Sequence, residues 1–551
     1  MVKHKSFNLI NHSWHSIIQF VGLFCLCCFL VISCSQPQNN PDNTPTTETT
    51  TNRITIGTTL KPRTIDPADA YEVISGNLLY NLGDRLYGYK LGTTELLPQL
   101  ATEMPKISED GTTYTIPIRQ GVTFHDGTPF NAEAMAFSFK RFIENSGPPS
   151  SLLTNTVESV EATGEYQLTM KLKKPFAAFT PLLAFSGLCA ISPQAYTIGE
   201  SQFKPDTFIG TGPYKLAEYG TDVLRLDVFE NYWGEKAKNQ GIDIQIFSSS
   251  ANLFNAFKTG AIDVAYASLD TDQITNLEAE ASRQGWQVIS TDGKTVNYMV
   301  LNLNSEPLNN KAVRQALASI IDRNLLNERV LQGKAEPVYS LIPTKFNGYK
   351  PVFQENYGDG NFNKAKELLK TAGYSQENPA KIEIWYAANS TKRQLTASTL
   401  KASVEQKLEG LMELELNSVE AATAFKNLDK GVYQTFILDW YGDFVDADNY
   451  IQPFLECTKG SKEKGCEQGA SQFQGSFYYS DQINQLIQQQ RQEQNPEKRQ
   501  AIFIEIQEIL GEDVPFIPLW LDKDYVFAQK NISGVSLEPT QQFPFWTINK
   551  S

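Results

Sequence analysis

Residues 110–142 read DGTTYTIPIRQGVTFHDGTPFNAEAMAFSFKRF and carry the densest structural signal in the chain. Apolar and polar residues alternate over 114–118, which predicts a β-strand with one buried face. Turn signals follow, and we interpret His125 among them as a turn residue rather than a catalyst. Asn131 is suited to cap a helix, because its side chain can accept a hydrogen bond from a free first-turn amide. Apolar side chains continue that helix along one face: Met135, Phe139 and Phe142.

A second stretch, residues 434–455 (QTFILDWYGDFVDADNYIQPFL), begins as an apolar strand and then breaks at Trp440, Tyr441, Gly442 and Asp443. The two rings offer flat apolar contact area with polar tips. A glycine at a strand end lets another backbone approach closely. The carboxylate of Asp443 could bind a cation such as an α-amino group. The alternative is an acidic, solvated turn, because Asp and Gly are also ordinary turn formers.

Composition and charge exclude several classes of function. The chain has 551 residues, of which 41% are hydrophobic, and its formal net charge of −14 argues against nucleic-acid binding. His125 is the only histidine after residue 34, so we expect no metal centre built from imidazoles, and no cofactor. A serine hydrolase would have to use His125, and no serine lies in a G-x-S-x-G motif. We therefore predict that the protein is not an enzyme.

The N-terminus has the pattern of a processing segment. Two lysines precede an apolar run over 17–32, and a serine before Cys34 resembles the lipobox of bacterial lipoproteins. We predict that residues 1–33 are removed, that Cys34 is acylated, and that 34–52 form a disordered polar tether. The alternative is an uncleaved membrane anchor. In either case we expect an exported protein held at a membrane, facing the periplasm or the cell exterior.

Three cysteines remain after Cys34. Cys457 and Cys466 bracket a polar loop in an exported chain, which favours a small-loop disulfide. Cys189 lies in an apolar stretch and is expected to be a buried free thiol.

Strand and helix patterns alternate throughout residues 53–548, without a repeat or an internal linker. This arrangement favours α/β lobes that share strands over a string of separate domains. The 110–142 block resembles the signature of the bacterial extracellular solute-binding proteins of family 5, the peptide, oligopeptide and nickel receptors of ABC importers. Four further blocks resemble that family in the same order: GTGPY (210–214), LNNKAVRQALASIIDR (308–323), NKAKELLKTAGY (363–374) and EILGEDVPFIPLW (508–520).

The resemblance implies a fold, namely an α/β two-lobed periplasmic-binding-protein fold (type II, cluster C) with an extra inserted domain. Transferred to this chain, lobe I comprises residues 53–75, 205–296 and 515–548. The extra domain comprises 76–204, and lobe II comprises 297–514. The ligand would be enclosed between the lobes.

The resemblance also implies a binding site. In the peptide receptors of the family, an aspartate at the position of Asp443 pairs with the α-ammonium group of the ligand. The backbone of 440–442 would bind the extended ligand as an added strand, with Tyr71 and Val73 at the opposite edge. Arg393 is a candidate for the C-terminal carboxylate. The loop between Cys457 and Cys466 resembles a disulfide loop of some members.

By the same resemblance, the protein would be a monomeric substrate-binding lipoprotein that delivers short peptides to the permease of an ABC importer. One alternative is a receptor of the same fold for a nickel chelate, haem, an opine or an oligosaccharide. The single histidine disfavours the first two, and Asp443 disfavours neutral sugars. An exported hydrolase is a further alternative, although no pair of nucleophile and base is visible.

Overall fold

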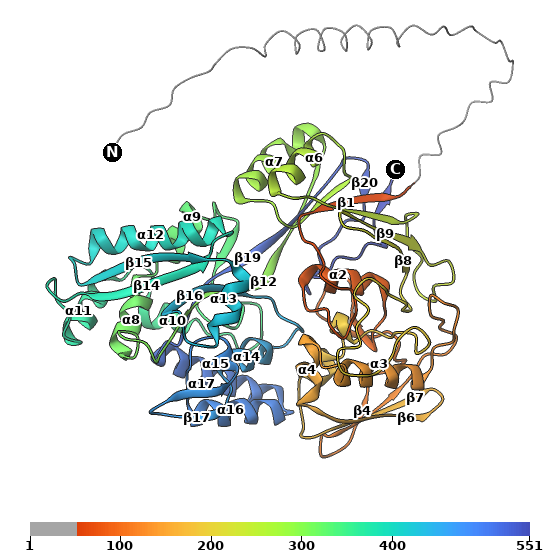
Figure 1. Ribbon diagram of the computed structural model, residues 1–551, viewed down its shortest axis with the longest axis horizontal. Helices are drawn as coiled ribbons and strands as arrows, with labels where there is room; N and C mark the ends of the chain where they lie inside the picture. Colours follow the sequence, from red (N-terminus) through yellow and green to blue (C-terminus); the bar gives the residue numbers. More distant parts are fainter. Residues whose placement is uncertain (1–51) are drawn as a thin grey trace, which may run out of the picture. The chain divides into compact units, whose positions relative to one another are not determined.

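One mixed sheet runs through the computed structural model, which describes residues 52–551, and two long strands form its centre (Figure 1). These strands, β12 (Gln287–Leu301) and β19 (Phe516–Ala528), pair antiparallel over most of their length. Beside β12 the order is β16 (Thr435–Trp440), β14 (Ala380–Ala387) and β15 (Met412–Val419). Beside β19 it is β11 (Val264–Tyr266), β1 (Ile54–Thr58), β10 (Ile242–Ile246), β9 (Val223–Val228) and β8 (Tyr214–Tyr219), while β13 (Ala335–Pro337) also pairs with β19.

We call the part built on β14–β16 the β16 half. Alternate residues of its strands enter two different apolar cores, since successive side chains of a strand point to opposite faces. Met299 and Ile437 lie in one core, and Val300 and Phe436 lie in the other. The longer helices packed on these faces are α8 (Lys311–Ile320), α11 (Phe362–Thr371), α12 (Thr391–Lys407), α16 (Asp481–Gln492) and α17 (Pro496–Asp513). The shorter ones are α9 (Arg323–Arg329), α10 (Val352–Tyr357), α13 (Ala421–Leu428), α14 (Gln452–Leu455) and α15 (Ala470–Phe473), with η3 (Ala447–Tyr450).

We call the part built on β1 and β8–β11 the β1 half. One of its apolar cores gathers residues from both ends of the described chain, for example Ile56 and Phe545. Its helices are α2 (Val73–Leu82), α6 (Ser250–Lys258) and α7 (Thr271–Gln284), and β20 (Ile532–Ser533) pairs with β21 (Asn549–Lys550) near the C-terminus. The core is therefore complete only when distant segments come together.

The 110–142 block folds as predicted, within a smaller sheet that has its own apolar core. The predicted strand is β5 (Thr113–Pro117), and the helix is α3 (Ala132–Glu144), whose first turn donates a hydrogen bond from Ala134 N to the Asn131 side chain. His125 lies in a turn, and burial lowers its pKa to about 4. The sheet also holds β4 (Lys106–Ile107), β6 (Val157–Gly164) and β7 (Gln167–Leu172). Near it lie β2 (Tyr87–Tyr89), β3 (Leu96–Pro98), η1 (Pro148–Ser150), α4 (Ser151–Thr154), α5 (Phe179–Leu182) and η2 (Ser186–Leu188).

Two of the described cysteines form a disulfide. Cys457 and Cys466 are joined across the hairpin of β17 (Cys457–Ser461) and β18 (Gly465–Gly469), with an S–S distance of 2.07 Å. Cys189 is a buried free thiol, as predicted. The predicted signal segment, Cys34 and the tether up to residue 51 lie outside the described residues. Within 52–551, no helix is both long and apolar enough for a membrane crossing.

Candidate ligand-binding site

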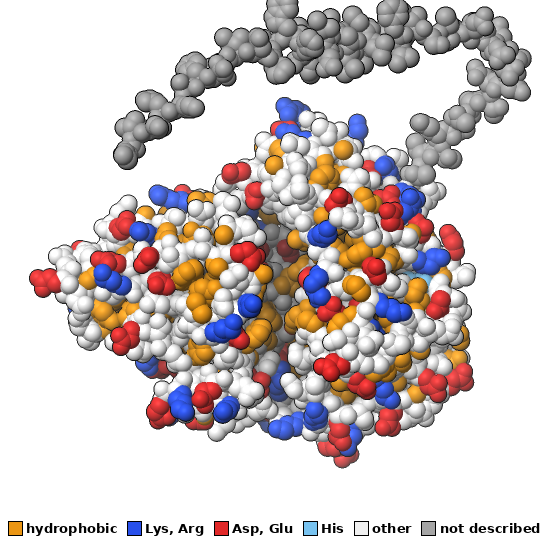
Figure 2. Space-filling view, in the orientation of Figure 1, with side chains coloured by type: hydrophobic (Ala, Val, Ile, Leu, Met, Phe, Trp, Pro, Cys, Tyr) orange, Lys and Arg blue, Asp and Glu red, His pale blue; other side chains and the backbone are white. Residues whose placement is uncertain are grey.

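A cavity of about 210 Å³ lies where the end of β16 meets the start of α2. Both halves of the molecule contribute to its walls, and the face in Figure 2 is hollowed between them. From the β16 half come Trp440, Tyr441, Gly442 and Asp443. The other walls are formed by Ala70, Tyr71, Glu72, Val73, Gly76, Asn77, Leu79, Phe185, Ser186, Gly187, Thr540 and Gln542.

Asp443 presents a desolvated carboxylate at this cavity. The Tyr71 hydroxyl donates to its Oδ2 at 3.0 Å, and the Asn449 amide donates to the same oxygen at 3.2 Å. Both donors are neutral, and Asp443 forms no ion pair with any residue in 52–551. Burial raises the pKa of Asp443 to about 6, although these two hydrogen bonds act in the opposite direction. A buried carboxylate without a counter-ion is a favourable place for a ligand cation.

The residues before Asp443 shape the wall. Tyr441 donates its hydroxyl to the Gln541 carbonyl at 3.0 Å, which ties this loop to the β1 half. The Trp440 indole Nε1 is buried without a hydrogen-bond partner among the described residues. A Cβ on Gly442 would lie 2.6 Å from the Tyr450 hydroxyl, so any larger residue would have to displace that buried side chain. The group that approaches Gly442 closely is thus the side chain of Tyr450, whereas the sequence led us to expect a backbone segment at this glycine.

Tyr71 and Val73 lie opposite Asp443, at the entry to α2. Both remain partly exposed, at 41% and 37%, and the Tyr71 ring meets Phe185 edge-on with ring centroids 6.3 Å apart. Glu72 is the other carboxylate of this wall, and it is already paired with Arg63 at 2.9 Å. The structure therefore brings six of the seven proposed ligand residues to one cavity.

Arg393 is the exception. It lines a separate, larger chamber of about 680 Å³, and its guanidinium contacts the Asp439 carboxylate. Because α12 begins at Thr391, its first turn places Arg393 beside the last residues of β16 rather than at Asp443. Its charge is thus engaged within the protein.

The acidic residues after Asp443 are not a solvated turn, so that alternative is wrong. Asp448 is buried and paired with Arg491 at 2.8 Å, and Asp446 is paired with Arg499 at 2.7 Å. Asn449 follows them and holds Asp443 in place, since its Oδ1 accepts from the Asp443 backbone N–H at 2.7 Å. These ion pairs fix the loop that presents Asp443. Sequence reasoning missed Asn449 and Phe185 as site residues, and no local pattern marks either one.

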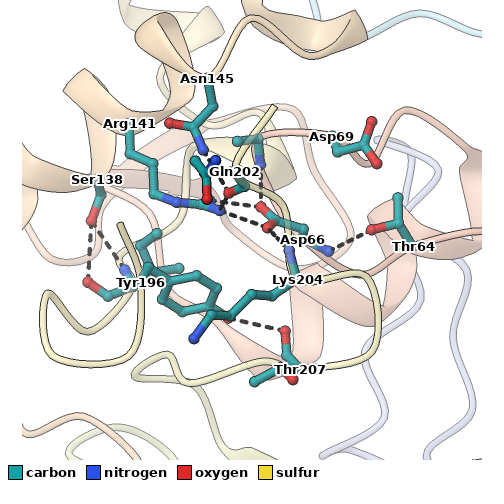
Figure 3. Close-up of polar contacts among 12 residues, drawn as sticks. Thr64, Asp66, Asp69, Ser138, Arg141, Asn145, Tyr196, Gln202, Lys204 and Thr207 are labelled. Atoms are coloured by element: carbon teal, nitrogen blue, oxygen red, sulfur yellow. Dashed lines mark hydrogen bonds and ion pairs between the residues drawn. The ribbon is translucent and has the colours of Figure 1, made fainter. Parts of the chain in front are cut away.

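A buried network holds the loop that leads to Tyr71 (Figure 3). Arg141, on α3, donates from both terminal nitrogens to Asp66, each at 2.7 Å, and both side chains are almost fully buried. Asp66 also accepts from the Lys204 backbone N–H at 2.7 Å, and Arg141 donates to the Gln202 carbonyl at 2.8 Å. The network thereby ties α3 to Asp66, which lies five residues before Tyr71 in the loop.

No group of three or more His, Cys, Asp and Glu side chains within 52–551 is arranged to hold a metal ion. The site offers one free carboxylate, aromatic walls and polar backbone, with no paired nucleophile and base. Such a site can bind a cationic group, but nothing in its geometry points to a reaction.

Three comparisons with known proteins each match most of this chain to solute-binding proteins. The sequence model of the bacterial extracellular solute-binding proteins, family 5 Middle, matches residues 95–462. The glutathione-binding protein GsiB of Escherichia coli (strain K12) is 26% identical over 502 residues, covering 88% of this chain and 91% of that protein. The dipeptide-binding protein of the same organism is 27% identical over 511 residues, covering 86% and 89%. The solved dipeptide binding protein from Pseudoalteromonas sp. SM9913, in complex with Met-Leu, has a TM-score of 0.77 at 20% identity and covers 90% of this chain and 100% of that chain.

Proposed function

The chain belongs to the bacterial extracellular solute-binding proteins of family 5, the binding components of ABC importers, and from this premise we propose that it captures short peptides. Its fold is the two-lobed α/β fold of the periplasmic binding proteins. The peptide would lie between the lobes and pass from there to a membrane permease. We propose that the protein works as a monomer and without catalysis, which mass measurement in solution and a peptidase assay would check.

The carboxylate of Asp443 carries the proposal. A peptide with a free N-terminus supplies the ammonium group that this desolvated carboxylate lacks. The backbone of 440–442 continues from β16 and offers hydrogen-bonding groups to an extended ligand. The names of the two relatives above, glutathione-binding and dipeptide-binding, support a peptide ligand.

We propose that lobe I comprises residues 53–75, 205–296 and 515–548, that the extra domain comprises 76–204, and that lobe II comprises 297–514. The apolar cores support this division. One core falls almost wholly within the extra domain, and two others lie mostly in lobe II, although both also take residues of β19, such as Phe516 and Ile517, from lobe I. The remaining core joins residues near both ends of the described chain and includes some residues of the extra domain, such as Leu78. Phe444 of lobe II also packs against the core of the extra domain, as expected for a site between them.

We propose that Cys34 carries a lipid anchor, on the basis of the apolar run and the Ser-Cys pair at its end. Cys34→Ser is expected to move the protein from the membrane fraction to the soluble fraction. Mass spectrometry of the mature N-terminus should show the acyl chains on the wild type. A wild-type N-terminus without acyl mass would rule the anchor out.

The proposal that the protein binds short peptides is tested most directly by native mass spectrometry of the purified protein, followed by calorimetric titration with di- and tripeptides. We expect a co-purified mass that matches a short peptide, and saturable binding with one site. A co-purified sugar or metal chelate, together with no response to any peptide, would overturn the proposal.

Binding of an alanine peptide is expected to weaken as the pH falls through 6. The raised pKa means that Asp443 takes up a proton near pH 6, and only its ionised form attracts an ammonium group. The peptide amino group, with a pKa of about 8, stays charged, so affinity should drop about tenfold from pH 7 to pH 5. Two neighbours should not interfere, because Glu72 is paired with Arg63 and the pKa of Lys294 is lowered only to about 8.

Calorimetry at pH 5, 6 and 7 measures this profile. Asp443→Asn should bind weakly at every pH, with a flat profile. A constant wild-type affinity across the range would show that Asp443 is not the titrating partner of the ligand.

A further inference from the structure

The larger chamber, about 680 Å³, lies between the two halves and next to the Asp443 cavity. Its walls come from the start of α7, from β19, and from residues 329–334 and 389–395. Its volume falls within the range of about 300–1,000 Å³ that is usual for ligand sites, whereas the Asp443 cavity alone is smaller. A ligand anchored at Asp443 and longer than one or two residues needs this additional space.

Two carboxylates of β19 face the chamber, and Lys392 pairs with only one of them, Asp522. Asp522 and Asp524 are two residues apart, so their side chains leave the strand on the same face. Lys392 Nζ lies 2.8 Å from both oxygens of Asp522, which also accepts from the Trp520 indole at 3.0 Å. Asp524 has only a long contact of 3.4 Å with the Gln541 amide and forms no ion pair within 52–551.

The other charges of the chamber do not compensate Asp524. Arg393 is engaged by Asp439, and Lys334 is engaged by Glu278. Arg329 and Lys523 also line the chamber, but within 52–551 neither forms an ion pair with Asp524 or with any other carboxylate. Asp524 is thus a desolvated carboxylate without a paired cation within 52–551, and burial raises its pKa to about 6.

Asp524 lies at the boundary between the chamber and the Asp443 cavity. The Gln541 amide contacts Asp524 at 3.4 Å, and the Gln541 carbonyl accepts from the Tyr441 hydroxyl at 3.0 Å, so one residue joins Asp524 to Tyr441. Tyr266 directly precedes Ala267, which lines the chamber. Tyr441 is a wall residue of the Asp443 cavity, and Tyr266 accepts from Asn77, another wall residue, at 2.7 Å. A ligand that extends from Asp443 into the chamber would therefore pass Asp524.

We infer that Asp524 receives a lysine or arginine side chain of the bound peptide, and that the protein prefers peptides with a basic residue. The inference rests on the proposed function, in which Asp443 holds the amino group. The ligand would then bring two cations to two carboxylates that the protein leaves uncompensated. A charge-assisted hydrogen bond in a site that excludes water is stronger than one between neutral groups.

The test compares peptides that differ in the ammonium group of one side chain and share the same free N-terminus. Each position of trialanine is replaced in turn by lysine, by norleucine, which keeps the whole aliphatic stem without the ammonium group, and by Nε-acetyl-lysine, which removes the charge. Calorimetric titration of the wild type should show at least one position where lysine binds about tenfold or more tightly than norleucine and acetyl-lysine. This comparison requires no variant, so it does not depend on how a variant folds.

Asp524→Asn removes the charge and keeps the shape. It should abolish the preference for lysine while leaving the affinity for the norleucine peptide within about twofold. The matched control is Asp272→Asn, which changes a carboxylate of the same chamber that is already bonded to Gln332, and which should preserve the preference.

The inference is overturned if no position favours lysine, or if the preference survives Asp524→Asn. Its failure is distinguishable from failure of the proposed function. Peptides that bind equally well with lysine and norleucine would contradict only the basic-residue subsite. Absence of binding by every peptide would contradict the proposed function, and the subsite with it.

Discussion

Asp443→Asn is expected to weaken the binding of a peptide with a free N-terminus by about 30-fold to several thousand-fold. Removing one partner of a buried charge pair leaves the other charge desolvated and unpaired, which costs about 2–5 kcal/mol. At about 1.4 kcal/mol for each tenfold change in affinity, this cost gives the stated range. An exposed ion pair would contribute only about 0–1 kcal/mol. Asparagine keeps the shape of the side chain and can still accept from Tyr71, so the change isolates the charge.

The matching change on the ligand completes the experiment. An N-acetylated peptide lacks the ammonium group, so it should bind the wild type poorly and respond little to Asp443→Asn. Titration of both peptides against both proteins forms a double-mutant cycle, in which a shared interaction gives losses that do not add. Additive losses would mean that Asp443 does not contact the amino group, and the peptide proposal would lose its main support.

Arg141→Met is expected to lower the free energy of unfolding by about 3–5 kcal/mol. The substitution would leave the buried carboxylate of Asp66 without its bidentate partner, and breaking one side of a buried ion pair is strongly destabilising. The loss should be smaller when Asp66→Asn is added, because the unpaired charge is then gone and the two effects do not add. Urea unfolding followed by circular dichroism measures each value.

The same loop supplies a matched control. Arg63 pairs with Asp69 at 2.7 Å, only three residues from Asp66, but the Arg63 side chain is 54% exposed. Arg63→Met should therefore change the free energy of unfolding by no more than about 1 kcal/mol. If the buried and the exposed arginine had equal effects, burial of the Asp66 pair would not be the cause of the loss.

Local structure was predictable where the signal was local. The strand and helix of 110–142 and the cap at Asn131 follow from spacing and from the chemistry of a single turn. Asp443 was also identifiable, because two rings, a glycine and a carboxylate stand together at the end of an apolar strand. Such patterns involve neighbours along the chain, and the sequence displays them directly.

The rest of the site depends on pairings across long separations. Tyr71 bonds Asp443 from 372 residues away, and the Arg141–Asp66 pair spans 75 residues. The sequence left an acidic, solvated turn open as an alternative for this loop, because the partners of Asp446 and Asp448 lie on helices that periodicity locates but does not orient. Arg393 was identified by type alone, and its neighbour Asp439 could be known only after the strand was placed against the helix.

The position of β19 in the sheet governs the order in which the chain can fold. This strand lies between β12 and β11, so neither half has its complete sheet until residues 516–528 are available. Synthesis and export proceed from the N-terminus, and contacts between distant segments form slowly. The last strand of the large sheet to be synthesised is thus the one that both halves require. A chain of this topology cannot complete its large sheet until residue 528 has been added, so most of its length has to wait for the last part.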